Sequence, residues 1–186
     1  RVVTFNKKRT QAVYLSGRNE VRVLDLKTFK DELVTKDELW GFNNSLPYFS
    51  PNDQFISFSA FRNFEQEIML YNTQTKKTIN LSNTSITETD PMWSQDGKYI
   101  YFTSSRLKPS YPFGIQNARI YRLPLENIDE PYRGDKFTEL FKEEKKDTSK
   151  KVIVKTDEVI NIDMDRIMDR LELVGPSFGS QAIVSL

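Results

Sequence analysis

Few residues of this chain could carry out catalysis, because its 186 residues include no histidine and no cysteine. The sequence GPSFG at residues 175–179 has the G-x-S-x-G spacing of a serine nucleophile, and it follows a strand-like run at residues 171–174. A nucleophilic serine needs a histidine base and a helix that begins directly after it. Because the chain has no histidine, and because proline and two glycines suit a plain turn, we interpret these residues as a turn between strands. No catalytic residue is predicted.

Carboxylates lie close together in the later part of the sequence. The set comprises Asp157, Glu158, Asp163, Asp165 and Asp169. A calcium loop places its oxygen ligands at alternating positions, with a glycine for the tight turn and a bidentate glutamate after it. No glycine stands between these carboxylates, so their spacing fits a charged strand end or turn better than a cation site. We therefore predict no metal site and no cofactor.

Three arginines recur at a spacing of 44 residues: Arg18, Arg62 and Arg106. The guanidinium group can bind a carboxylate through two parallel hydrogen bonds, so arginines along one rim could capture a ligand. A contact between neighbouring structural units must recur with the repeat, whereas a ligand contact need not. The repetition therefore favours pairing with backbone or with an acid between adjacent units.

The charge balance excludes several classes of function. The chain has 27 Lys and Arg against 26 Asp and Glu, a net charge of +1, and so lacks the basic excess with which proteins bind nucleic acid or an anionic membrane surface. No apolar run approaches the roughly 18–20 residues of a membrane span. We expect no nucleic-acid partner and no membrane insertion. The absence of cysteine is compatible with a periplasmic or other extracytoplasmic location without showing one.

The strongest pattern is an internal repeat of about 44 residues, which marks a repeat architecture. PYFSPNDQFISFS at residues 47–59 aligns with PMWSQDGKYIYFT at residues 91–103, and a more divergent copy precedes them. The repeat matches aromatic residues with one another, and we assign such aromatics to packing between units. The aromatic residues concerned are Tyr48, Phe49, Phe58, Trp93 and Phe102.

Each copy predicts four short antiparallel strands. An aromatic strand end is followed by a polar turn and by apolar residues that alternate at period two, which indicates a β-hairpin, and two further short strands follow. The Asp96-Gly97 pair predicts a two-residue turn with two positive φ angles. Four strands in 40–45 residues are typical of a propeller blade, whose sheet must stack on its neighbours to bury both faces.

Two segments depart from the repeat. An inserted loop at residues 107–119 is rich in aromatic residues and proline, and it could either carry recognition or cap a neighbouring edge. A charged excursion covers residues 126–151, in which the apolar spacing from Phe137 to Phe141 would give one short amphipathic helix. We interpret this excursion as a solvated segment between outer strands rather than as a partner helix. Residues 152–154 and 159–162 are expected to form strands.

The repeat resembles a known family. The sequence PMWSQDGKYIYFTSSR at residues 91–106 is similar to the β-propeller repeat of tricorn-type proteases and of the Tol system, although Gln95 stands where that repeat usually has proline. IDMDRIMDRL at residues 162–171 resembles the stretch of tricorn-like proteases that links one propeller strand to the next. The two together cover most of residues 46–186. The resemblance implies a serine peptidase parent whose propeller guides or filters peptides toward a separate catalytic domain, and no position here matches the serine and histidine of that domain.

The sequence therefore predicts an all-β fold, an incomplete propeller of about three to four four-stranded blades. The expected units are residues 1–45, 46–89 and 90–170, with the start of a further blade at 171–186. Residues 1–10 contain neither methionine nor an apolar signal core, and we expect a piece of a longer protein. Expected partners are peptides or proteins and the remaining domains of the parent chain, with self-association possible through open blade edges. The alternative function is a protein-binding propeller of the periplasmic Tol type with no peptidase attached.

Overall fold

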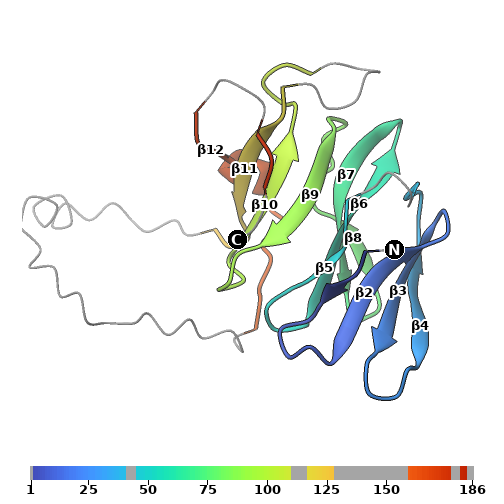
Figure 1. Cartoon of the computed structure of the whole chain (residues 1–186). Coiled ribbons are helices and arrows are strands. Elements are labelled where there is room, and N and C mark those ends of the chain that lie inside the picture. Colours follow the sequence, from blue (N-terminus) through green and yellow to red (C-terminus); the bar gives the residue numbers. More distant parts are fainter. Residues whose placement is uncertain (1, 41–44, 110–116, 128–158, 177–180, 184–186) are drawn as a thin grey trace, which may run out of the picture.

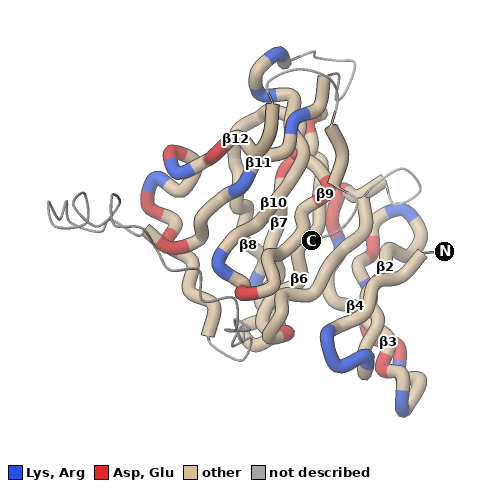
Figure 2. Tube along the Cα trace, turned by 60° about the vertical axis from the view of Figure 1, so that its left-hand side comes forward, with Lys and Arg blue, Asp and Glu red and all other residues tan. Residues whose placement is uncertain are grey.

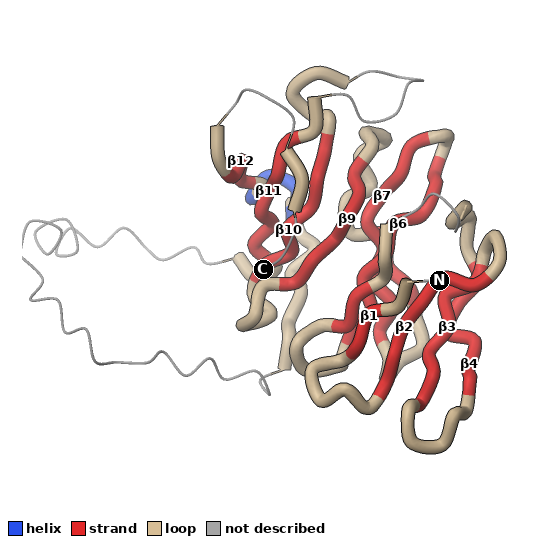
Figure 3. The backbone as a smooth tube through the Cα atoms, viewed as in Figure 1, coloured by secondary structure: helices blue, strands red, loops and turns tan. Residues whose placement is uncertain are grey.

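The computed structural model describes residues 2–40, 45–109, 117–127, 159–176 and 181–183. Within these residues the chain forms three four-stranded antiparallel sheets, which follow one another along the sequence and lie side by side (Figure 1). Regular structure in the described part is almost all strand, with one short 3-10 helix (Figure 3). No helix there is long and apolar enough to cross a membrane. The all-β class and the incomplete propeller are confirmed.

Each sheet, or blade, consists of four strands that are consecutive in sequence, as predicted. The first blade contains β1 (Thr4–Phe5), β2 (Gln11–Ser16), β3 (Glu20–Asp25) and β4 (Asp31–Lys36). The second contains β5 (Tyr48–Phe49), β6 (Phe55–Arg62), β7 (Glu65–Asn72) and β8 (Thr78–Asn80). The third contains β9 (Glu88–Trp93), β10 (Tyr99–Ser104), β11 (Arg119–Pro124) and β12 (Glu172–Val174).

The turn between the first two strands has the same construction in all three blades. A polar residue at its start accepts a hydrogen bond from the backbone N–H five residues later, at 2.9–3.0 Å; these residues are Asn6, Ser50 and Ser94. The residue three positions after each has a positive φ; these are Arg9, Asp53 and Gly97. The 44-residue spacing therefore reflects one recurring backbone geometry.

The turn around Gly97 is wider than the two-residue turn predicted from Asp96-Gly97. Gly97 has a φ of +72°, but Asp96 does not have a positive φ, and its carboxylate instead accepts hydrogen bonds from the Ser94 hydroxyl (2.6 Å) and the Lys98 N–H (3.0 Å). Glycine is needed here for space as well, because a Cβ at this position would lie 2.8 Å from Cδ1 of Ile160. The two-residue turn was wrong because side-chain hydrogen bonds close a longer loop.

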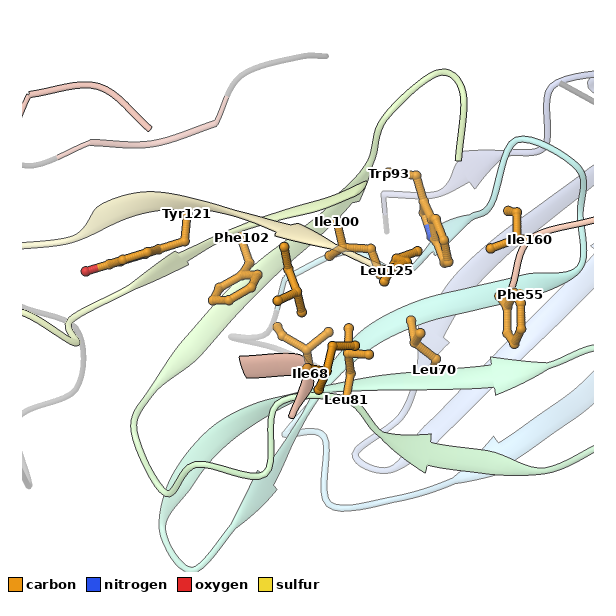
Figure 4. Close-up of a cluster of buried hydrophobic side chains, with 12 residues drawn as sticks. Phe55, Ile68, Leu70, Leu81, Trp93, Ile100, Phe102, Tyr121, Leu125 and Ile160 are labelled. Carbon is orange, nitrogen blue, oxygen red and sulfur yellow. The ribbon is translucent and has the colours of Figure 1, made fainter. Parts of the chain in front are cut away.

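The core lies between the blades. One cluster of buried side chains joins the first and second blades, and it includes Val13, Val21, Phe58 and Met69. The other joins the second and third blades, and Figure 4 shows its side chains, among them Phe55, Ile68, Trp93 and Phe102, spread along the space between the strands. Phe58 and Phe102, which occupy equivalent positions in the repeat, are both fully buried. The matched aromatics therefore pack between blades, as predicted.

The third blade ends differently from the prediction. Residues 171–174 were expected to open a further blade, but β12 pairs with β11, with Ile120 opposite Val174, and so completes the third blade as its outer strand. Residues 159–162 are not a strand, because the side chain of Ile160 turns into the core between the second and third blades. A 3-10 helix, η1 (Ile167–Arg170), leads into β12.

Several expectations fall outside the described residues. These are the strand at 152–154, the helix from Phe137 to Phe141, most of the excursion at 126–151, residues 110–116 of the inserted loop and residues 177–180 of the GPSFG pattern.

Candidate functional site

Three segments meet at one rim of the first and second blades and form an open groove there. They are the β2–β3 turn, the connection that leaves β4, and the β6–β7 turn. We call this the rim groove. Its first half is lined by Arg18, Asn19, Lys36, Asp37, Glu38, Leu39 and Trp40. Its second half is lined by Asp37, Glu38, Trp40, Phe61, Arg62, Asn63 and Phe64. Trp40 and the two acids belong to both halves.

Backbone hydrogen bonds fix the floor of the rim groove. The N–H of Asp37 donates to the carbonyl of Asn19 at 2.9 Å, which ties the connection to the β2–β3 turn. The N–H of Phe61 donates to the carbonyl of Glu38 at 2.7 Å, which ties it to β6. Leu39 is fully buried in the core between the two blades. The connection after β4 is therefore fixed by hydrogen bonds to both blades and by the burial of Leu39 between them.

An ion pair closes the joint between the first and second blades. The Arg62 guanidinium donates to both carboxylate oxygens of Asp37, at 2.7 and 2.9 Å, and to the carbonyl of Phe61 at 2.7 Å. This is the pairing between adjacent units that the arginine repeat predicted. Arg106 pairs instead with Glu88 of its own blade, at 2.7 Å. Arg18 lies over the ring of Trp40, 4.3 Å from its centroid.

The aromatic side chains of the groove are unusually exposed. Trp40 is 53% exposed and Phe64 is 84% exposed. The Trp40 and Phe61 rings meet edge to face, with centroids 6.5 Å apart and an interplanar angle of 74°. Exposed aromatic rings next to polar groups are characteristic of surfaces that bind other molecules. Such an arrangement offers apolar faces to a ligand together with charged groups beside them.

The backbone under two of these rings is strained. Trp40 has a φ of +47°, and in the β6–β7 turn Asn63 and Phe64 have φ of +50° and +71°. Because Arg62 pairs with Glu65, the two residues between them form a two-residue hairpin turn, in which glycine would normally follow asparagine. A phenylalanine in that position costs stability and directs its ring into solvent. Strain of this kind is often maintained at ligand-binding sites, but positive φ also occurs in other turns of the described chain, among them Phe29 in the β3–β4 turn, so it does not by itself mark the groove.

The charges around the second half of the groove are mostly acidic. Asp37 is neutralised by Arg62, whereas the Glu38 side chain is exposed. Partial burial raises the pKa of Glu65, which follows Phe64 at the start of β7. Over the rest of the described chain the charges of both signs are interspersed (Figure 2). The groove therefore favours a cationic or neutral ligand over an anionic one.

A second polar cluster lies at the start of β9. The carboxylate of Glu88 is fully buried beside Arg106, and burial raises its pKa, an effect that hydrogen bonds from Ser82 and Arg106 oppose. The hydroxyl of Tyr121 is buried near the same charges. The Glu88–Arg106 pair thus joins the start of β9 to the residues that follow β10.

Of the carboxylates singled out from the sequence, Asp157 and Glu158 lie outside the described residues, and those of Asp163 and Asp169 make local contacts. Asp163 accepts a hydrogen bond from the N–H of Asp165 at 2.9 Å, and Asp169 pairs with Arg166. Arg170 donates to the carbonyls of several neighbours, among them Asp163 and Asp165. Within the described residues no group of three or more potential ligands could hold a metal ion. Residues 162–171 thus anchor the return of the chain to β12.

Trp40 and Phe64 were not among the residues predicted from the sequence to be functional. A signal was available, because these aromatics have no aromatic counterpart in the repeat. The position 44 residues after Trp40 is Thr84, and the position 44 residues after Phe64 is Lys108. An aromatic residue that does not recur is not required by the packing that all blades share, although Trp40 does contact Phe61 of the second blade.

Comparison with known proteins gives one family match and several structural matches. A family model described as "Eukaryotic translation initiation factor eIF2A" matches residues 3–115. No curated protein is similar enough in sequence to match the chain.

Among solved structures, TolB from Acinetobacter baumannii is 23% identical with a TM-score of 0.54 over 68% of this chain, and the tricorn protease is 18% identical with a TM-score of 0.59 over 95%. A TolB-like protein from Agrobacterium tumefaciens is 13% identical with a TM-score of 0.53 over 65%. The chain spans 30%, 17% and 44% of these structures, less than half of each. The likeness establishes the propeller fold.

Proposed function

We propose a function from the premise that the chain belongs to the family described as eukaryotic translation initiation factor eIF2A, whose model matches more than half of it. The chain is a non-catalytic propeller segment that binds extended polypeptide in the rim groove. In its parent protein this propeller guides or filters peptides for a separate tricorn-like peptidase domain and serves as a scaffold for that domain.

The observation that carries the binding role is the rim groove itself. Trp40 and Phe64 expose apolar rings. The segment that carries Trp40 is hydrogen-bonded to both blades at Asp37 and Glu38, and Phe64 lies in the two-residue β6–β7 turn. Trp40 is packed against Phe61 and Arg18, so a ligand would have less of the Trp40 side chain to order, which lowers the entropic cost of binding. An extended chain has both apolar side chains and backbone groups to match such a groove.

Polypeptide is favoured over nucleic acid by the charges. The name of the family refers to translation, in which RNA and proteins both take part. The chain has a net charge of only +1, and the second half of the groove contains more carboxylates than free cations. A phosphate backbone requires the opposite arrangement.

The link to a peptidase is supported by two features. The sequence at residues 162–171 resembles the tricorn-like group, and the tricorn protease has the same fold over 95% of this chain. A serine protease triad needs a histidine base, which these 186 residues lack, so the proposal assigns the catalytic step to a separate domain.

A protein-binding propeller of the Tol type is the alternative, and the 23% identity with TolB favours it. The two functions differ in the downstream part of the full open reading frame. The peptidase function requires a later domain with a serine and a histidine, whereas an interaction module would end soon after its last blade.

Binding of labelled peptides tests the proposal directly. A fluorescein-labelled library of unstructured peptides is titrated with the full chain, and anisotropy reports binding. We expect Phe64→Ala to weaken binding at least about fivefold, since an exposed aromatic anchor at an interface is worth about 1 kcal/mol or more.

The matched control is Phe29→Ala. Phe29 is also exposed (76%) and also has a positive φ (+56°), but it lies in the β3–β4 turn, at the opposite rim. If the two variants bind alike, or if no peptide binds, the rim groove is not a polypeptide site.

A further inference from the structure

We propose that the second half of the rim groove binds the basic side chain, lysine or arginine, of the polypeptide that occupies it. This inference rests on the proposed function, because it specifies which residue of the bound polypeptide the groove recognises. The observation behind it is that three aromatic rings and two carboxylates line one small region of surface.

The aromatic rings offer the first part of the recognition. A cation is attracted to the face of an aromatic ring, most strongly to that of tryptophan. The chain already shows this chemistry at the same residue, since the guanidinium of Arg18 lies 4.3 Å from the centroid of Trp40. Phe61 meets Trp40 edge to face, and Phe61 and Phe64 both line the second half of the groove, whose lining does not include Arg18.

Charged side chains provide the second part of the recognition. Arg62 is the cation in this half of the groove, and its guanidinium is already bound by both oxygens of Asp37 and by the Phe61 carbonyl. Hydrogen bonding to Asp37 raises the pKa of Arg62, and the charge of Glu38 also helps to raise it. The hydrogen bonds of Arg62 nevertheless go to Asp37 and Phe61, so the exposed Glu38 carboxylate is accessible to a ligand. A lysine or arginine placed over the rings would have this carboxylate as its partner, whereas an acidic residue would be repelled.

Two hydrogen bonds fix the backbone of Glu38. Its N–H donates to Oδ1 of Asp37 at 2.8 Å, and its carbonyl accepts from Phe61 at 2.7 Å. The Asp37–Arg62 pair thus anchors both the residue that carries the carboxylate and the start of the turn that carries Phe64. A rigid arrangement of this kind selects for side-chain chemistry more sharply than a flexible one.

The test uses a peptide series that differs at one residue. Fluorescein-labelled peptides of about nine residues, made of glycine and serine around a leucine pair, carry lysine, arginine, norleucine or glutamate at the centre. Each is titrated with the full chain. We expect lysine and arginine to bind at least about fivefold more tightly than norleucine, and glutamate to bind most weakly.

Variants of the chain show whether the groove causes this preference. Glu38→Gln should reduce the preference for lysine over norleucine to less than about twofold while it leaves norleucine binding unchanged. Glu38→Lys should reverse the order of lysine and glutamate. Glu126→Gln, which removes an exposed carboxylate next to the end of β11, is the control and should leave the preference intact.

The outcomes separate this inference from the proposed function. If lysine and norleucine peptides bind equally and both are weakened by Phe64→Ala, the groove binds polypeptide but the basic-residue specificity is wrong. If no peptide binds, both are wrong. Binding of a labelled single-stranded oligouridine that Phe64→Ala weakens would overturn both in favour of RNA.

Discussion

Substitutions of Phe64 separate two effects: the free energy of the strained backbone in the β6–β7 turn, and the contribution of the exposed ring to peptide binding. At a φ of +71° a bulky residue costs about 1–2 kcal/mol, and glycine would remove that cost. Glycine loses more backbone entropy on folding, which offsets about 0.5–1 kcal/mol of the gain. The ring itself contributes little because it is 84% exposed. We therefore expect Phe64→Gly to stabilise the chain by about 0.5–1 kcal/mol.

Phe64→Ala is the matched comparison, because alanine removes the ring and keeps the strained backbone. It should lie within about 0.5 kcal/mol of the native chain in equilibrium urea unfolding. Peptide binding should weaken to the same extent in both variants, since both lack the ring. Equal stability of the glycine and alanine variants, or a loss of stability with glycine, would refute the argument that strain is maintained here for binding.

Three further predictions concern the packing of the blades and are measured by thermal or urea unfolding of the full chain. Gly97→Ala should cost about 2 kcal/mol, because its Cβ would lie 2.8 Å from Ile160 and its φ is +72°; an unchanged melting temperature would contradict this. Phe102→Ala should cost about 3–5 kcal/mol, whereas Phe5→Ala, at 52% exposure, should cost less than about 1 kcal/mol; similar costs would contradict the assignment of the core. Burial raises the pKa of Glu88 above its ordinary 4.5, so the stability it contributes is fully present below pH 4.5 and decreases as the pH rises through the folded-state pKa. Glu88→Gln should lack that decrease, and parallel pH profiles for the two proteins would show that this carboxyl does not titrate as argued.

The fold was predictable because packing between blades repeats. Each blade must bury both faces against neighbours, so Phe58 and Phe102 have the same surroundings and leave the same mark in the sequence. The limits of the third blade were not predictable from the same signal. β12 is separated from β11 by the charged excursion, and only the pairing of the two strands shows to which blade it belongs.

Local turn chemistry accounts for the other errors. The Asp96-Gly97 pair indicates a tight turn, but a hydrogen bond from the Ser94 hydroxyl to Asp96 stabilises a wider one. Residues 159–162 contain the apolar alternation of a strand, yet Ile160 is drawn into the core under Gly97, and its backbone pairs with the side chain of Gln54 at 3.0 and 3.1 Å. Because Gln54 and Ile160 are 106 residues apart, no pattern in the neighbouring sequence predicts this contact.

The sequence repeat did not reveal the rim groove. The reason also explains where propellers of this kind can acquire binding specificity. A residue that packs between blades must be of similar type in every copy, so the repeat identifies it. Such a residue has little freedom to change in order to bind a ligand. The rim is free of that constraint, and its residues Trp40 and Phe64 have Thr84 and Lys108 as their counterparts one repeat later. The connection between β10 and β11, which contains the inserted loop, occupies the same place in the third blade as the β2–β3 and β6–β7 turns occupy in the first two. The other departure, the charged excursion, lies in the connection between β11 and β12 and so belongs to the opposite rim. Connections at both rims can thus change, and binding specificity with them, while the packing between blades is preserved.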